Sequence, residues 1–121
     1  MDKKIVMVVD DTQIIRNIIS KALGEEYYIV EAENGDYAIN KLQMLNYGIS
    51  GMFLDLIMPG SDGYKVLDEL KRLNIKLPIT VISGDDSTET ITKVCNEYGV
   101  NYISKPLSMD KIKATADNMC K

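Results

Sequence analysis

Short apolar runs rich in β-branched residues alternate along this chain with segments whose apolar residues recur every three or four positions. The first run covers residues 4–9, and Ile14, Ile15, Ile18 and Ile19 follow it at helical spacing. An unbroken apolar run is typical of a strand buried on both faces, and the wider spacing indicates an amphipathic helix. The two patterns alternate five times along the sequence, which predicts five βα units.

This alternation predicts an α/β domain in which helices cover both faces of a parallel sheet. Right-handed crossovers and the small number of units favour an open, doubly wound sheet over a barrel. Ligands of such sheets bind beyond the carboxyl ends of the strands, where the strand order reverses. Functional side chains are therefore expected directly after the predicted strands, which cover residues 4–9, 27–32, 49–54, 79–82 and 100–104.

The composition fits a single globular domain over residues 1–121, with no output domain. A chain of 121 residues, 45% of them hydrophobic, buries a sizeable core without a disulfide or a structural metal. No apolar stretch is long enough to span a membrane, and no signal peptide follows Met1. Two cysteines without C-x-x-C spacing favour a reducing, cytoplasmic setting. Four methionines are interpreted as core or edge residues that fill gaps, namely Met44, Met52, Met109 and Met119.

The polar residues exclude several classes of function. The net charge is −4 and no run of Lys or Arg occurs, which argues against direct contact with nucleic acid. The chain has no histidine, so histidine general bases, Ser-His-Asp or Cys-His nucleophiles and histidine-bound zinc are all excluded. The first strand is not followed by a glycine-rich phosphate loop, which argues against a nucleotide site.

The candidate functional side chains follow the first, third, fourth and fifth predicted strands, and we expect them to meet at one edge of the sheet. Asp10 and Asp11 follow the first strand, Asp55 the third, Ser83 the fourth and Lys105 the fifth. Each one alone has a simpler interpretation, because acidic residues after strands cap helices, a serine before glycine marks a turn, and a lysine before proline is solvated. Together, three carboxylates at one edge repel one another unless a cation lies between them.

The residue types at this edge indicate which cation and which chemistry to expect. Oxygen ligands without histidine or cysteine favour Mg²⁺, with several waters kept, over zinc or a calcium cage. A carboxylate beside a bound metal can act as a nucleophile and accept a phosphoryl group as an acyl phosphate. Asp55 is the central carboxylate and the natural candidate, and Lys105 supplies a second positive charge for phosphate oxygens.

Four motifs around these strand ends resemble the receiver domain of two-component response regulators. They are VVDD at 8–11, LDLIMPG at 54–60, VISG at 81–84 and YISKP at 102–106. Their order, their spacing and their placement at strand ends match the family together, over essentially the whole chain. The resemblance implies a flavodoxin-like, five-stranded parallel sheet with the strand order 2-1-3-4-5 and five helices.

The resemblance also implies a role for each residue of the set. Asp55 becomes the phosphoacceptor, and Ser83 and Lys105 contact the phosphoryl oxygens. Mg²⁺ and the Lys105 ammonium offset the charge on the transferred group, while the strand ends fix the in-line geometry. The implied Mg²⁺ ligands are the side chains of Asp10, Asp11 and Asp55 and the backbone carbonyl of Ile57.

In this family a serine and an aromatic residue act together as a switch, which implies that role for Ser83 and Tyr102. The hydroxyl moves toward the phosphoryl group, and the ring turns into the vacated space. A partner surface then changes on the last two predicted helices and on the strand 100–104. Without the resemblance, Tyr102 is interpreted as a half-buried core tyrosine. Ile57 and Gly84 depart from commoner family patterns beside the attacking water, which leaves the lifetime of the phosphorylated state open.

The resulting hypothesis is a signalling module rather than a metabolic enzyme. It accepts a phosphoryl group from a phosphohistidine of a sensor histidine kinase or a histidine phosphotransfer protein. It catalyses its own phosphorylation and dephosphorylation, and its altered surface binds a downstream protein. The sequence leaves open whether it is a free-standing regulator, as in chemotaxis or phosphorelays, or the receiver of a longer protein.

Two alternatives use the same residues. A haloacid-dehalogenase-like phosphohydrolase also combines a strand-one Asp with Ser or Thr, Lys and Mg²⁺, but it needs an acid where this chain has Thr12. A pseudo-receiver binds partners without phosphorylation, and the intact set of strand-end residues argues against it. Multiple turnover on a phosphomonoester would favour the phosphohydrolase, and a phosphorylation assay separates the pseudo-receiver from the switch.

Overall fold

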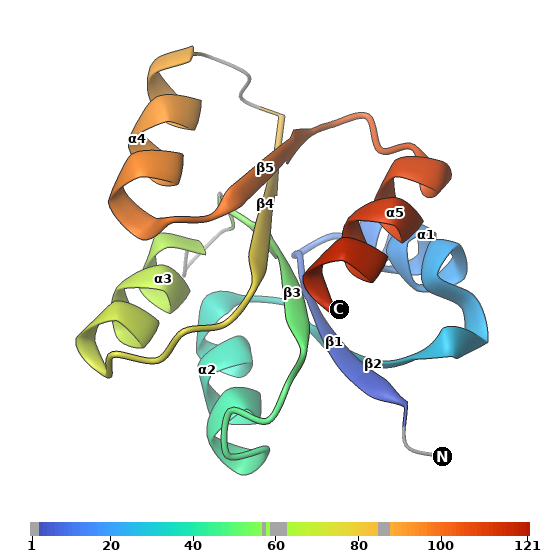
Figure 1. Ribbon diagram of the computed structural model, residues 1–121, viewed down its shortest axis with the longest axis horizontal. Helices are drawn as coiled ribbons and strands as arrows, with labels where there is room; N and C mark the ends of the chain where they lie inside the picture. The colour runs from blue at the N-terminus through green and yellow to red at the C-terminus, as the bar shows by residue number, and fades with distance from the viewer. Residues whose placement is uncertain (1–2, 57, 59–62, 85–87) are drawn as a thin grey trace.

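Five parallel strands form one sheet in the computed structural model, which describes residues 3–56, 58, 63–84 and 88–121 (Figure 1). The strand order is β2-β1-β3-β4-β5, which confirms the predicted doubly wound topology. Neighbouring strands pair in parallel throughout, with Val9 opposite Ala32 and Leu54 at one end of the sheet. The strands are β1 (Lys4–Val9), β2 (Tyr27–Ala32), β3 (Gly51–Asp55), β4 (Ile79–Ser83) and β5 (Asn101–Ser104).

Helices cover both faces of the sheet (Figure 1). On one face α1 packs against α5, and α2, α3 and α4 lie on the other. A short 3-10 turn, η1 (Gly24–Glu26), joins α1 to β2. The helices are α1 (Gln13–Leu23), α2 (Gly35–Met44), α3 (Gly63–Arg72), α4 (Thr88–Tyr98) and α5 (Met109–Met119).

The central strands are buried on both faces, as their unbroken apolar runs predict. In β3, Met52 and Leu54 belong to the core beneath α2 and α3, whereas Phe53 points into the core beneath α1 and α5. All five residues of β3 and of β4 are buried. A strand with two buried faces has no solvated side, so its sequence shows no polar alternation.

Local signals in the sequence explain where the helices begin and end. The Asn34 side chain caps α2 by accepting a hydrogen bond from the Tyr37 N–H at 2.9 Å. Ser108 caps α5 in the same way. Gly24 ends α1 with a φ of 63°, a backbone conformation that disfavours residues with a Cβ.

Some sequence predictions need correction. The third strand begins at Gly51, two residues later than predicted, and β5 begins at Asn101 rather than at residue 100. Met52 is fully buried, but Met44 is 84% exposed and does not fill the core. Met44 ends α2 on the side away from its buried residues, Ala38 and Leu42. Met119 is buried and Met109 is exposed.

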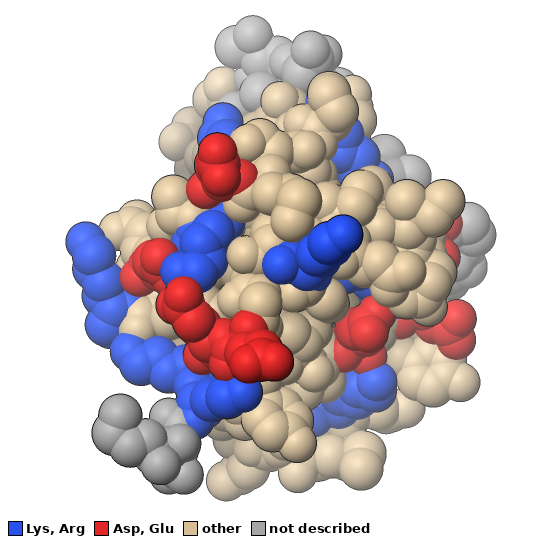
Figure 2. Space-filling view, turned by 90° about the vertical axis from the view of Figure 1, so that its right-hand side faces the viewer, with Lys and Arg blue, Asp and Glu red and all other residues tan. Residues whose placement is uncertain are grey.

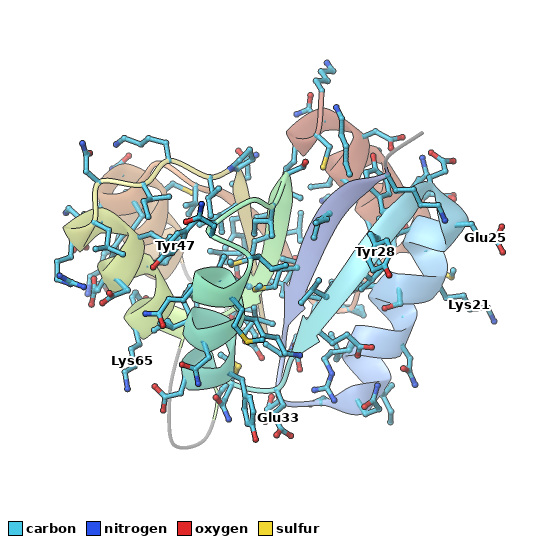
Figure 3. The ribbon with its side chains drawn as sticks, turned by 90° about the horizontal axis from the view of Figure 1, so that it is seen from below. Lys21, Glu25, Tyr28, Glu33, Tyr47 and Lys65 are labelled. Atoms are coloured by element: carbon cyan, nitrogen blue, oxygen red, sulfur yellow. The ribbon has the colours of Figure 1, made fainter. Side chains whose placement is uncertain are left out.

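Two further views show residues near the carboxyl end of the sheet and the charges on one helical face (Figures 2 and 3). Figure 3 shows Glu33 just past the carboxyl end of β2, and Lys65 on α3. On the face with α1 and α5, basic and acidic side chains are interspersed rather than gathered by sign (Figure 2). Among the residues that the structure describes, no helix combines the length and the apolar character that a membrane crossing requires.

Candidate functional site

The carboxyl ends of four strands bring the predicted polar residues together. Asp10 follows β1, Asp55 and Ser83 are the last residues of β3 and β4, and Lys105 follows β5. The burial of these residues argues against the simpler interpretation that they only cap helices or mark turns. Asp10 is 0% exposed, Asp55 4% and Ser83 3%. Acidic side chains are seldom fully buried unless they are paired or hold a ligand. The sheet therefore gathers a buried acidic site at this edge.

Three carboxylates form the centre of the site. Asp10, Asp11 and Asp55 each offer one carboxylate oxygen, and these oxygens all lie within 4.8 Å of one another. Asp10 and Asp55 are buried, whereas Asp11 is exposed. Like charges this close in a poorly solvated place repel strongly, and a cation between them relieves the repulsion.

The two oxygens of Asp10 have different surroundings. Oδ1 accepts a hydrogen bond from the Thr12 N–H at 2.8 Å, which fixes the orientation of the carboxylate. Oδ2 is buried and accepts no hydrogen bond from any residue that the structure describes. A buried charged oxygen without a donor is unfavourable unless a cation contacts it. The Lys105 ammonium lies 3.5 Å from Oδ2 and partly meets this need, and Oδ2 remains a candidate metal ligand.

Mg²⁺ fits this set of donors. The ion prefers carboxylate oxygens and usually keeps several waters, and the exposure of Asp11 leaves one side of the cluster open to solvent. The absence of histidine from the chain and of cysteine from the cluster disfavours zinc and copper. The fourth predicted ligand, the backbone carbonyl of Ile57, lies outside the described residues.

Lys105 provides a positive charge beside the carboxylates. Its Nζ lies 3.4 Å from Asp55 Oδ2 and 3.5 Å from Asp10 Oδ2. Burial of the ammonium lowers its pKa, but the two carboxylates raise it by more, so the pKa of Lys105 lies above its ordinary value. The side chain stays charged at neutral pH and partly balances the acidic cluster.

Ser83 and Tyr102 occupy adjacent strands near this edge. In the β4–β5 pairing Ser83 lies opposite Ser104, and Val81 lies opposite Tyr102. The Ser83 carbonyl accepts a hydrogen bond from the Lys105 N–H at 3.0 Å, which ties β4 to the residue beyond β5. Tyr102 is half-buried and packs against the core beneath α2, α3 and α4. The two predicted switch residues therefore lie on β4 and β5, the strand pair that the Lys105 backbone extends.

Comparison with known proteins decides the family. Residues 6–117 match the response regulator receiver domain family. The chain belongs to this family. The match includes the strand ends described above, which favours a receiver domain over the dehalogenase-like alternative.

Individual relatives agree with this assignment. Response regulator RR06 of Streptococcus pneumoniae serotype 2 is 34% identical over 107 residues, covering 86% of this chain and 47% of that protein. A putative NtrX-like response regulator of Rickettsia bellii is 31% identical over 95% of this chain and 24% of its own length. This receiver domain thus spans less than half the length of these curated relatives.

Solved structures are similar over nearly their full length. The receiver domain of NtrX from Brucella abortus superposes with a TM-score of 0.82 at 29% identity, covering 95% of this chain and 97% of that one. The Francisella response regulator 1452 receiver domain gives a TM-score of 0.84 at 27% identity, with 97% and 96% covered. Receiver domains therefore share this sheet, its strand order and its helical layers.

Two contributors to the site were missed by the sequence analysis. Arg16 is buried, with 8% of the residue exposed, and its side chain donates a hydrogen bond to the carbonyl of Asp10. A signal was present, because Arg16 shares the buried face of α1 with Ile19 and Leu23, where a charged residue is unexpected. Gly63 is the second contributor, since it lies directly against the backbone of Asp55.

Proposed function

We propose that this receiver domain is a phosphorylation switch that accepts a phosphoryl group on Asp55. The donor is a phosphohistidine of a sensor histidine kinase or of a histidine phosphotransfer protein, as membership of a two-component family suggests. One observation carries the proposal: the buried Asp55 carboxylate lies in the acidic cluster with an ammonium 3.4 Å away. The residues proposed as nucleophile, as metal ligands and as the cation for phosphate oxygens therefore lie close together, which supports the proposal.

The proposed transfer is a displacement at phosphorus. An oxygen of Asp55 forms the new P–O bond as the P–N bond of the phosphohistidine breaks, and the imidazole nitrogen keeps the electron pair and takes up a proton. The Lys105 ammonium attracts the phosphoryl oxygens, since its raised pKa keeps it charged. Asp10, Asp11 and Asp55 would hold Mg²⁺, which would supply further positive charge for the phosphoryl oxygens. Hydrolysis of the acyl phosphate then returns the domain to its unphosphorylated state. In this proposal the domain catalyses its own phosphorylation and dephosphorylation, and it is a signalling module rather than a metabolic enzyme.

We propose that the output surface consists of α4, β5 and α5. Ser83 reaches the phosphoryl group, and the half-buried Tyr102 changes its packing in response. β5 is an edge strand with α5 on one side and α4 on the other, so a change at Tyr102 reaches a surface that a downstream protein can bind (Figure 1). Phosphorylation then shifts a population between two states rather than creating a new shape.

A mass measurement tests the proposal. The protein is incubated with Mg²⁺ and acetyl phosphate, and its intact mass is compared with that of Asp55→Asn and of an EDTA-treated sample. We expect the gain of one phosphoryl group in the wild type alone. An equal gain in Asp55→Asn assigns the chemistry to another residue. No gain in a wild type that binds Mg²⁺ favours a pseudo-receiver, and addition of a phosphorylated histidine donor then separates that case from a strict need for a protein donor.

A further inference from the structure

A buried arginine connects three elements next to the acidic cluster. The Arg16 Nε donates to Glu31 Oε1 at 3.0 Å, and Nη2 donates to Gln13 Oε1 at 2.7 Å. Nη1 donates to the carbonyl oxygen of Asp10. The acceptors lie in the first turn of α1, in β2 and directly after β1. Arg16 therefore fixes the start of α1 against the ends of both strands.

These contacts complete the fixation of Asp10. The Asp10 N–H donates to the Ala32 carbonyl at 3.1 Å, and its Oδ1 accepts from the Thr12 N–H at 2.8 Å. Arg16 holds the carbonyl. Three of the four polar atoms of Asp10 thus take part in hydrogen bonds, and the fourth, Oδ2, lies 3.5 Å from the Lys105 Nζ.

The geometry requires an arginine. A planar guanidinium presents donors in several fixed directions, so one side chain reaches Glu31, Gln13 and Asp10 at once. A lysine ammonium is a single point and cannot bridge the same three acceptors. The guanidinium also places a buried positive charge behind the acidic cluster without occupying any of its ligand oxygens, while Glu31 balances that charge.

We propose that Arg16 is a positioning residue for the Mg²⁺ site, acting through the backbone of Asp10, with Glu31 and Gln13 holding the guanidinium in place. This inference rests on the proposed function, because it assumes that the acidic cluster binds Mg²⁺. Partners that orient metal ligands from the second layer typically contribute ten- to hundredfold to metal affinity. Arg16 thus sets the affinity for the ion rather than the chemistry of transfer.

The test compares Arg16→Met with Arg72→Met, which removes the chain's other arginine, an exposed side chain paired with Glu69 on α3. Mg²⁺ affinity is measured by isothermal titration calorimetry, and phosphorylation by acetyl phosphate is followed as a function of Mg²⁺ concentration. We expect Arg16→Met to raise the half-saturating Mg²⁺ concentration by about tenfold. The rate at saturating Mg²⁺ stays close to that of the wild type, and Arg72→Met changes neither quantity.

Two further variants separate positioning from a merely structural role. Arg16→Lys keeps the charge and one contact, so it recovers part of the Mg²⁺ affinity, and Glu31→Gln causes a smaller loss than Arg16→Met. If Arg16→Met does not fold, the Mg²⁺ affinities of these two variants test the inference instead. Variants with lower melting temperatures but wild-type Mg²⁺ affinity overturn the inference and leave the proposed function intact. A wild type that binds no Mg²⁺ overturns the proposed function itself.

Discussion

The carboxyl ends of β1 and β3 are held differently from the region around α4 and β5. Asp10 and Asp55 extend buried central strands, and backbone and side-chain hydrogen bonds fix Asp10 further. β5 is a four-residue edge strand with only one buried residue, Ile103. Between α4 and α3 the Tyr98 hydroxyl donates to Asp68 at 2.6 Å, and the Tyr64 and Tyr98 ring centroids are 6.3 Å apart.

The proposed phosphoryl-transfer site therefore lies in the more tightly held region, and the proposed partner-binding surface lies in the other. Asp55, the proposed acceptor, and Asp10, a proposed metal ligand, are fixed by close packing, where even small changes in volume are costly. The proposed output region is held in part by exposed polar contacts, and each such contact contributes only about 1 kcal/mol. A modest bias from a phosphoryl group is then enough to move the second region without disturbing the first.

The strongest test of the rigid centre is Gly63→Ala. A Cβ at Gly63 would overlap the Asp55 carbonyl oxygen and approach the Leu56 Cα to 2.8 Å, and neither backbone atom can move freely. We expect the free energy of unfolding to fall by about 3 kcal/mol, because overpacking against a buried strand forces the backbone to shift. Urea denaturation followed by circular dichroism measures the change.

Gly84→Ala is the matched control, since a Cβ at that position meets no atom within 4 Å among the residues that the structure describes. We expect its unfolding free energy to stay within about 0.5 kcal/mol of the wild type. Similar losses in both variants would show that the end of β3 is packed no more tightly than the residue after β4, and the comparison between the two regions would not hold.

A smaller effect is expected when the charge balance of the centre changes. At ten times its dissociation constant, Mg²⁺ should raise the unfolding free energy of the wild type by about 1.4 kcal/mol, because only the folded state assembles the site. Asp11→Asn removes one of the three carboxylates, so its gain at the same Mg²⁺ concentration should be much smaller. Thermal melts with Mg²⁺ and with EDTA measure both gains.

Asp110→Asn serves as the control for charge, because Asp110 is exposed in the first turn of α5 and lies outside the acidic cluster. It should keep the full stabilisation by Mg²⁺. Equal stabilisation of Asp11→Asn and the wild type would mean that Mg²⁺ binds elsewhere, and the buried carboxylates would then need another explanation.

The sequence predicted most of the fold because the signals for the fold are local. Apolar runs located each strand to within two residues, and Asn34, Ser108 and Gly24 mark helix ends by hydrogen bonding or backbone conformation. Periodicity does not determine which strands are neighbours. The order 2-1-3-4-5 was available only from the resemblance to receiver domains, and the structure confirms it.

The site was predictable where each residue follows a strand directly. Asp10, Asp55 and Lys105 meet because parallel strands end at one edge of the sheet. The contribution of Arg16 was not predictable, since its partner Glu31 lies on another strand and their contact depends on how α1 packs. The close approach of Gly63 to Asp55 likewise depends on the packing of α3.

The smallest predicted effect concerns the contact between α3 and α4. Burial of the Tyr98 ring and its hydrogen bond to Asp68 raise the pKa of Tyr98 well above its ordinary value of 10.0. The folded state therefore keeps this proton at a pH where the unfolded chain loses it. The resulting stability is fully present below about pH 10 and is lost as the pH rises toward the folded-state pKa.

Tyr98→Phe tests this contact against Tyr28→Phe, whose hydroxyl belongs to a side chain 65% exposed on the edge strand β2 (Figure 3). Tyr98→Phe should lower the unfolding free energy by about 1 kcal/mol at pH 7. Above pH 10 its stability should fall less steeply than that of the wild type, whereas Tyr28→Phe should follow the wild type, as urea denaturation across this range would show. Identical curves for all three proteins would mean that apolar packing alone holds α4. The output region would then resist displacement as the centre does, and a phosphoryl group would need to supply correspondingly more energy to move it.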